Sequence, residues 1–377
     1  MGGSKLKQKI LITAALPYTN NVPHIGNIVG SHLPADIFAR FNRLQGHEVV
    51  FIGGTDEHGT ASEIAAQKAG ITPKELCDFF YKIHKEIYDW WQISYDNFSR
   101  TSKKIHHETT QEFFKEIYKN GFVKEQTLKL PFCLSCQRPL ADRFIEGECP
   151  SCHKQARGDQ CENCSKILDP IELIKPTCAV CKSNKIEFRE SKHLFLELNK
   201  LAHKLKAWIT DNKELRPQVK ALALGWIKEG LEPRCITRDL KWGVKVPLKG
   251  YEDKVFYVLF DAPIGYISST KEWNNKKWKE LWTKSKIYNF IGKDNIPFHT
   301  IFFPGMILAN GGYKLPFNVV GLQYCNYERT KFSKSKGIGI FCENLAKADL
   351  ESDYWRFYAT YLIPETKDTD FIWNEFK

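Results

Sequence analysis

The sequence predicts an α/β fold in which a mainly parallel β-sheet carries helices on both faces, and two observations lead to this prediction. Short apolar runs alternate with segments of helical periodicity, both early and late in the chain. Such alternation implies a Rossmann-type sheet, because parallel strands need a crossover helix between them. Between the two parts lies a segment rich in cysteine, glycine and proline without apolar periodicity, so we expect an insertion that interrupts the sheet.

The first half of the sheet is expected within residues 5–124. An apolar run at 10–15 predicts a buried strand, and a second strand is expected at 48–53. Apolar residues at helical spacing predict helices, which should span residues 26–44, 60–68 and 74–91.

Residues 125–238 are expected to form the insertion, whose part at 125–189 is too poor in periodic apolar residues to build its own core. Two helices, at 194–208 and 218–229, should follow this cysteine-rich part within the insertion. The sheet should then resume within residues 239–322, and residues 323–377 should form a short helical region containing a lysine-rich loop. The elements expected there are strands at 254–260, 288–292 and 318–321 and helices at 301–308 and 354–362.

Composition places the chain among ordinary globular proteins, with 42% hydrophobic and 26% charged residues in a length of 377. The 55 basic and 44 acidic residues give a net charge of +11, which favours a polyanionic partner; a merely basic surface is the alternative. No apolar run approaches the ~20 residues that span a bilayer. The run after Lys5 ends without a small-residue cleavage site, so we expect a first strand instead of a signal peptide, and no membrane partner.

Eight of the twelve cysteines form four Cys-x-x-Cys pairs. In a chain without a secretion signal, such pairs indicate metal ligands in a reducing compartment, by default the cytoplasm, although an organelle would also fit. Eight thiolates suit two closed, structural zinc sites, with redox-active pairs as the alternative, and the insertion should unfold without its metal. Spacing alone does not assign which pairs share an ion. The pairs are Cys133/Cys136, Cys149/Cys152, Cys161/Cys164 and Cys178/Cys181.

Two short stretches, more than three hundred residues apart, carry the strongest functional signal. Pro23-His24-Ile25-Gly26-Asn27 opens the first expected helix directly after a strand, where free backbone N–H groups suit phosphate. Lys331-Phe332-Ser333-Lys334-Ser335 places two lysines three residues apart on a loop. Taken alone, the first stretch could contain a purely structural histidine, and the second could be a solvated basic loop. Together, each beside a strand–helix unit, they indicate a triphosphate that is held from two sides.

The two stretches resemble the split signature of class I aminoacyl-tRNA synthetases, and the motifs around them resemble the methionyl-tRNA synthetase family from about Ile10 to the last residue. Asn27, where that family usually has histidine, is similar to the eukaryotic and archaeal branch. The resemblance implies that methionine and ATP, with Mg²⁺, react to methionyl-adenylate and pyrophosphate, and that methionine then passes to the 3′ adenosine of tRNA(Met). It implies catalytic roles for His24, Asn27, Lys331, Lys334 and Arg238, and ATP contacts from His24, Gly26, Asn27, Gly292, Asp294, Lys331, Ser333 and Lys334.

The resemblance also implies a methionine site. Asp56, within Gly54–Thr60, matches the aspartate that receives the substrate ammonium; a helix cap is the alternative. Leu259 stands where the family commonly has tryptophan, so the pocket should be roomier, slightly weaker, or filled by Tyr266 or Phe298. The residues implied to bind methionine are Ala15, Leu16, Tyr18, Asp56, Leu259, Ala262, Pro263, Tyr266, Phe298 and His299.

For the cysteines, similarity to the family's zinc knuckles suggests nested sites, with sequential pairing as the alternative. The inner site would hold Cys149, Cys152, Cys161 and Cys164, and the outer site Cys133, Cys136, Cys178 and Cys181.

The competing functions are synthetases for other amino acids and a nucleic-acid-binding protein. Synthetases for leucine, isoleucine or valine need a large editing domain, for which the insertion is too short, because a hydrophobic pocket separates near-isosteres by only ~1–3 kcal/mol. A cysteine enzyme would place zinc in the pocket instead of in an insertion. A zinc-ribbon nucleic-acid-binding protein on an inactive scaffold would need none of His24, Asp56, Asp294 and Lys334. We expect the chain to stop before the family's anticodon-binding bundle, and therefore to be a catalytic fragment that makes methionyl-adenylate but charges tRNA poorly.

Overall fold

A five-stranded parallel sheet forms the centre of the computed structural model, which describes residues 7–377 apart from 142–143, 159–160, 162, 165–167 and 333–336. The strand order is β14-β13-β1-β2-β3, and every neighbouring pair is parallel. The predicted α/β fold with a parallel sheet is thus confirmed. The strands are β1 (Lys9–Ala14), β2 (Glu48–Thr55), β3 (Asn97–Arg100), β13 (Lys286–Gly292) and β14 (Asn318–Leu322).

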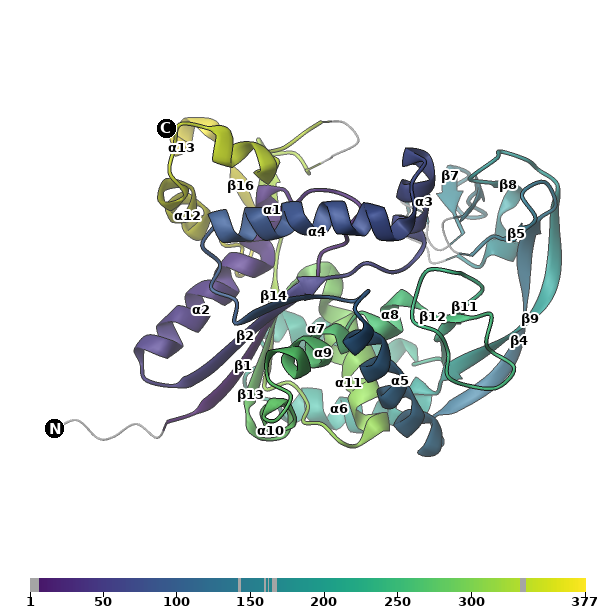
Figure 1. The fold of residues 1–377 in the computed structure, drawn as a ribbon, viewed down its shortest axis with the longest axis horizontal. Coiled ribbons are helices and arrows are strands. Elements are labelled where there is room, and N and C mark those ends of the chain that lie inside the picture. The colour runs from purple at the N-terminus through teal and green to yellow at the C-terminus, as the bar shows by residue number, and fades with distance from the viewer. Residues whose placement is uncertain (1–6, 142–143, 159–160, 162, 165–167, 333–336) are drawn as a thin grey trace.

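Helices cover both faces of this sheet, as Figure 1 shows. Along β1, Leu11 packs into one apolar core and its neighbours Ile10 and Ile12 pack into the other. A strand buried on both faces has to be apolar throughout, which explains the continuous run in the sequence. One face carries α2 (Leu33–Leu44) and α4 (Pro73–Trp90); the other carries α5 (Lys104–Lys119), α9 (Ile264–Trp273), α10 (Trp278–Lys284) and α11 (Phe303–Asn310).

The first predicted helix is present but contains a wider turn. It begins as α1 (Ile25–Asn27), continues as a π-helical segment over Ile28–His32, and then becomes α2. Single π-turns of this kind often occur at functional sites. The other predicted helices of this half are α3 (Thr60–Ala69) and α4.

The insertion extends from the sheet as a long two-stranded arm, at the right of Figure 1. Strands β4 (Val123–Cys133) and β9 (Ile186–Leu196) pair antiparallel over their whole length, from Val123↔Leu196 to Cys133↔Ile186. The tip carries β5 (Arg138–Pro139) and a small sheet of β6 (Ile145–Glu148), β7 (Gln155–Arg157) and β8 (Ile174–Cys178). A small apolar cluster, which includes Phe144 and buried cysteines, fills the tip, so this part has more core than the sequence indicated.

Two predicted elements are wrong in part. The helix expected at 194–208 begins late, because β9 continues to Leu196 opposite Val123, and the α-helix proper is α6 (Ala202–Asp211). The strand expected at 254–260 ends after β12 (Val255–Phe256), and the chain then turns into the short helix α8 (Val258–Asp261). A short apolar run fits either a buried strand or a buried helix, and only the tertiary neighbours decide between them.

The last part of the chain folds back onto the α2 side of the sheet. It contains β15 (Cys325–Tyr327), α12 (Ser352–Tyr361), β16 (Thr369–Phe371) and α13 (Trp373–Phe376), with α7 (Pro217–Glu229) completing the predicted helices on the other side. Within the described ranges, no helix has both the length and the apolar character that crossing a bilayer requires.

Candidate active site

A cavity of about 720 Å³ lies where the central strands end. The carboxyl ends of parallel strands meet at one edge of a sheet, which is where α/β proteins bind their ligands. Ala15 follows β1, Asp56 follows β2, and Asp294 lies two residues beyond β13. The predicted site residues that line the cavity are Ala15, Leu16, Tyr18, His24, Gly26, Asn27, Asp56, Leu259, Ala262, Pro263, Tyr266, Gly292, Asp294, Phe298, His299 and Lys331.

The two signature stretches converge at this cavity. The ring of Phe332 stacks on the ring of His24, with centroids 4.4 Å apart and planes 2° apart. Below the stack, the backbone N–H of Ile25 donates to the carbonyl of Ile340, and the N–H of Cys342 donates to Pro23. The segment that follows the lysine loop is therefore hydrogen-bonded to the segment that opens the first helix.

Glycine is required where Phe332 is held. A Cβ atom at Gly339 would collide with the Phe332 ring, and Gly339 has φ +136°, which side chains rarely adopt. A Cβ atom at Gly26 would lie 3.1 Å from the same ring. The aromatic ring thus fixes how closely the two signature stretches approach each other.

Asn27 has a local role that accounts for an amide at this position. Its Oδ1 accepts a hydrogen bond of 3.0 Å from the backbone N–H of His24, so the two residues cap the start of the helix. Because the oxygen is committed to this bond, the amide NH₂ is the group left to donate into the cavity. An uncharged donor can bind a phosphate oxygen, although it neutralises no charge.

Asp56 is a buried carboxylate at the cavity wall, with an exposed fraction of 4%. Burial, the nearby charge of Asp261 and that of Glu57 raise its pKa well above the ordinary value, against a hydrogen bond from the backbone N–H of His58. Among the described residues, its Oδ1 has no hydrogen-bond partner. A buried carboxylate needs a counter-charge, and a ligand ammonium can supply it.

Aromatic and aliphatic side chains surround the rest of this part of the cavity. The Nδ1 of His299 donates to the carbonyl of Asn295 at 3.0 Å, so its Nε2 accepts from the hydroxyl of Tyr266, also at 3.0 Å. Burial lowers the pKa of His299 to about 4, so the imidazole is neutral and the wall carries no charge here. Leu259 contributes an aliphatic surface beside Phe298, which suits an unbranched apolar side chain.

Tyr324 is a site residue that sequence reasoning missed. It lies two residues after β14, lines the cavity, and donates its hydroxyl to the Asp294 carboxylate. Lys293 and Lys331 lie over its ring, with Nζ atoms 3.8 and 5.5 Å from the centroid. Its position after a parallel strand was the available signal, because Asp56 and Asp294 also follow parallel strands.

Three predicted residues remain to be accounted for. Ser333 and Lys334 lie outside the described residues. Arg238 belongs to β11 (Thr237–Arg238), and its guanidinium lies 3.6 Å from the ring centroid of Tyr257 instead of in the cavity lining. Its contact with a reacting group therefore stays a prediction.

The eight cysteines of the insertion gather into two groups of four. One contains Cys133, Cys136, Cys178 and Cys181 and the other Cys149, Cys152, Cys161 and Cys164, which is the nested grouping and excludes the sequential one. Sulfur atoms within a group lie 3.5–3.8 Å apart where pairs are closest. A tetrahedral zinc ion with Zn–S bonds of about 2.3 Å requires edges of about 3.8 Å, so both groups fit a metal of that kind.

Backbone donors favour the thiolate form in these groups. The N–H of Cys136 points at the sulfur of Cys133, and that of Ser151 at the sulfur of Cys149, each at 3.4 Å. A backbone hydrogen bond from Lys154, with bonds from neighbouring cysteines, lowers the pKa of Cys152 to about 6. Metal binding needs thiolates, so the local backbone is arranged for it.

Comparison with known proteins first defines the class. A family model described as "tRNA synthetases class I (M)" matches residues 10–377, so the chain belongs to the class I aminoacyl-tRNA synthetases. Within that class it is a member of the methionine family, as the resemblance of the motifs predicted.

Several relatives carry names in agreement with this. Methionine–tRNA ligases of Treponema denticola and Borreliella afzelii are 47% and 48% identical over 99% and 98% of this chain, and the cytoplasmic enzyme of Caenorhabditis elegans is 45% identical over 98%. The chain spans 48%, 52% and 41% of those proteins, about half their length. The crystal structure of Mycobacterium tuberculosis methionyl-tRNA synthetase bound by methionyl-adenylate shares the fold, with a TM-score of 0.78 at 24% identity over 98% of this chain and 67% of that one.

Proposed function

We propose that this chain is the catalytic region of a methionine–tRNA ligase, which activates L-methionine with ATP and then transfers it to tRNA(Met). The observation that carries the proposal is the convergence of His24 and Lys331 on one cavity that also contains Asp56. The names of the curated relatives support methionine as the amino acid. The net charge of +11 supports a nucleic-acid partner.

In the first step, the methionine carboxylate attacks the α-phosphorus of ATP and pyrophosphate leaves with the bonding electrons. Negative charge grows on the triphosphate, so fixed donors aimed there lower the barrier. His24, Asn27 and Gly26 would contact the phosphates from the helix side, and Lys331, with Ser333 and Lys334, from the loop side. Gly292 and Asp294 would hold the ribose, and Mg²⁺ bound with ATP would balance part of the phosphate charge.

Methionine would bind with its ammonium on Asp56 and its thioether between Leu259, Tyr266 and Phe298. Ala262, Pro263 and His299 would complete the pocket, with Ala15, Leu16 and Tyr18 at its entrance. Zinc, held by the two cysteine groups, would stabilise the insertion at 125–238 without touching the reaction, because four thiolates leave no open position. We place the enzyme in the cytoplasm, which the names of the animal relatives support.

Exchange of labelled pyrophosphate into ATP, measured with each of the twenty amino acids in turn, tests the proposal. We expect exchange with methionine alone, and its loss in the Asp56→Asn variant. Exchange with a different amino acid would refute the assigned specificity. No exchange with any amino acid, by a folded protein, would favour a binding module on an inactive scaffold.

A further inference from the structure

A buried histidine–aspartate pair lies directly behind the carboxylate of Asp56. The Nδ1 of His58 lies 2.5 Å from the Oδ2 of Asp261, and the side chains are 1% and 0% exposed. His58 follows β2 two residues after Asp56, and Asp261 ends α8, one residue before the cavity residue Ala262. Two distant segments of the methionine pocket are thus joined by one short contact.

His58 is connected to Asp56 from two directions. Its backbone N–H donates to the Asp56 carboxylate, and its side chain pairs with the carboxylate whose charge acts most strongly on Asp56. The third carboxylate of the group, Glu57, already has a cation of its own, because Arg100 contacts it at 2.7 Å. Asp261 has no arginine or lysine among its described ion pairs and depends on histidine.

The other titratable side chains around the pair, those of His106, His107 and Tyr266, do not compensate the charge of Asp261. From α5, the Nε2 of His106 lies 3.9 Å from Asp261, and the ring of His107 lies 5.3 Å from that of His58. Burial lowers the pKa of His106, and lowers that of His107 to about 4, so both are uncharged near neutral pH. Tyr266, which faces Asp56 from α9, has a raised pKa because it is buried, and it stays neutral as well.

The His58–Asp261 pair affects whether Asp261 and Asp56 can both be ionised. The pKa of Asp261 is lowered: burial acts to raise it, but the interaction with His58, which includes a hydrogen bond of 2.5 Å, and the nearby ring of His106 outweigh burial. Asp261 is therefore ionised. Two buried carboxylates that are close together do not both ionise unless one of them is compensated.

We propose that His58 is a positioning residue that keeps Asp56 ionised, and so able to bind the substrate ammonium, through its buried 2.5 Å contact with the carboxylate of Asp261. The inference rests on the proposed function, since it assigns Asp56 the ammonium. It adds a residue that touches neither substrate nor nucleotide and acts through a neighbouring carboxylate. Without the His58 imidazole against it, the negative charge of Asp261 would raise the pKa of Asp56 further. Methionine would then bind only at a higher pH.

The test is the pH dependence of the methionine KM in pyrophosphate exchange, from pH 5.5 to 8.5. His58→Asn keeps a donor toward Asp261 but removes the ring that can carry a positive charge. We expect the acid limb of the profile to move up by about one pH unit, which raises KM about tenfold at a pH below both limbs. Asp261→Asn should move the limb the opposite way, and the double variant H58N/D261N should bring it back to the native position or below it.

His107→Asn is the matched control, because it removes an uncharged ring from the same cluster and should leave the limb in place. The KM for ATP and the melting temperature are recorded for each variant. A rise in KM by the same factor at every pH in H58N would mean a purely structural role and would overturn the inference. If H58N does not fold, D261N decides alone: a limb that stays in place or moves up refutes the charge argument. Absence of exchange in the native protein would instead refute the proposed function.

Discussion

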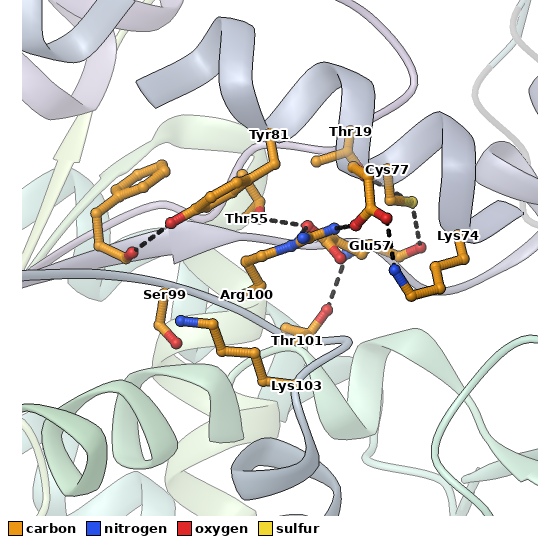
Figure 2. A network of polar contacts seen from close by, with 12 residues as sticks. Thr19, Thr55, Glu57, Lys74, Cys77, Tyr81, Ser99, Arg100, Thr101 and Lys103 are labelled. Atoms are coloured by element: carbon orange, nitrogen blue, oxygen red, sulfur yellow. Dashed lines mark hydrogen bonds and ion pairs between the residues drawn. The ribbon is translucent and has the colours of Figure 1, made fainter. Parts of the chain in front are cut away.

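Replacing Arg100 by glutamine should destabilise the protein by about 3 kcal/mol, because it leaves a buried carboxylate without its cation. Glu57 has no exposed side-chain surface. Its Oε1 accepts from the Nε of Arg100 at 2.7 Å and from the hydroxyl of Thr55 at 2.8 Å. Figure 2 shows this network between the end of β2, β3 and α4. Arg100 also contacts Asp78 at 2.6 Å.

The magnitude follows from which of the two contacts is buried. Removing one partner of a buried pair costs about 3–5 kcal/mol, whereas an exposed pair contributes about 0–1 kcal/mol. Asp78 is 36% exposed, so its contact adds little, and Arg100 is itself 14% exposed, so water can reach part of the site. We therefore expect the lower end of the range. The double variant E57Q/R100Q contains no buried charge at this place and should recover most of the loss.

Urea unfolding followed by tryptophan fluorescence measures this difference at equal m-value. Lys103→Gln is the matched control, because Lys103 pairs with Glu272 at 2.7 Å nearby but is 38% exposed; it should cost less than about 1 kcal/mol. The reasoning is refuted if R100Q costs no more than this control. It is equally refuted if the double variant is no more stable than R100Q alone.

Three further predictions concern the pocket and the insertion. Asp56→Asn should raise the melting temperature by about 1–3 °C. The raised pKa of Asp56 means that its ionised form destabilises the folded state at any pH above the unfolded pKa, by about 1.4 kcal/mol for each pH unit by which the pKa is raised. A lower melting temperature would contradict this. Leu259→Trp should lower the methionine KM about two- to tenfold through contact with the thioether, and an unchanged or higher KM counts against it. Chelation of metal should expose the amides of residues 134–185 to hydrogen exchange while β1 stays protected; retained protection of the tip would show that metal is not required there.

The sheet could be predicted because its strands are buried on both faces. Leu11 and Ile12 belong to different cores, so neither could be polar, and the run is visible without knowledge of the fold. The site residues were predicted from the resemblance to the family, and the same topology brings them together. Asp56 and Asp294 follow parallel strands, and such strand ends meet by necessity at one edge.

What could not be predicted depends on partners distant in sequence. Leu194 and Leu196 fit a helix or a strand, and only pairing with β4 makes them a strand. Residues 258–260 are as apolar as a buried strand, yet they lie in the helical turn α8, where Phe260 stacks on Phe256 with ring centroids 4.9 Å apart. The ring stack of His24 on Phe332 joins residues more than three hundred positions apart, and no local pattern encodes it.

The charges behind the pocket are the physical reason why we expect an ammonium to bind this site better than a neutral group. Asp56, Glu57 and Asp261 bring three carboxylates into one buried region. Arg100 compensates Glu57 and His58 faces Asp261, so the chain supplies a balancing group for two of the three. Asp56 has none among the described side chains that contact it, and its charge opposes folding until a cation arrives. A ligand ammonium would therefore gain affinity by removing an unfavourable charge that is already present in the empty pocket. A neutral isostere of the proposed substrate methionine would lack that gain.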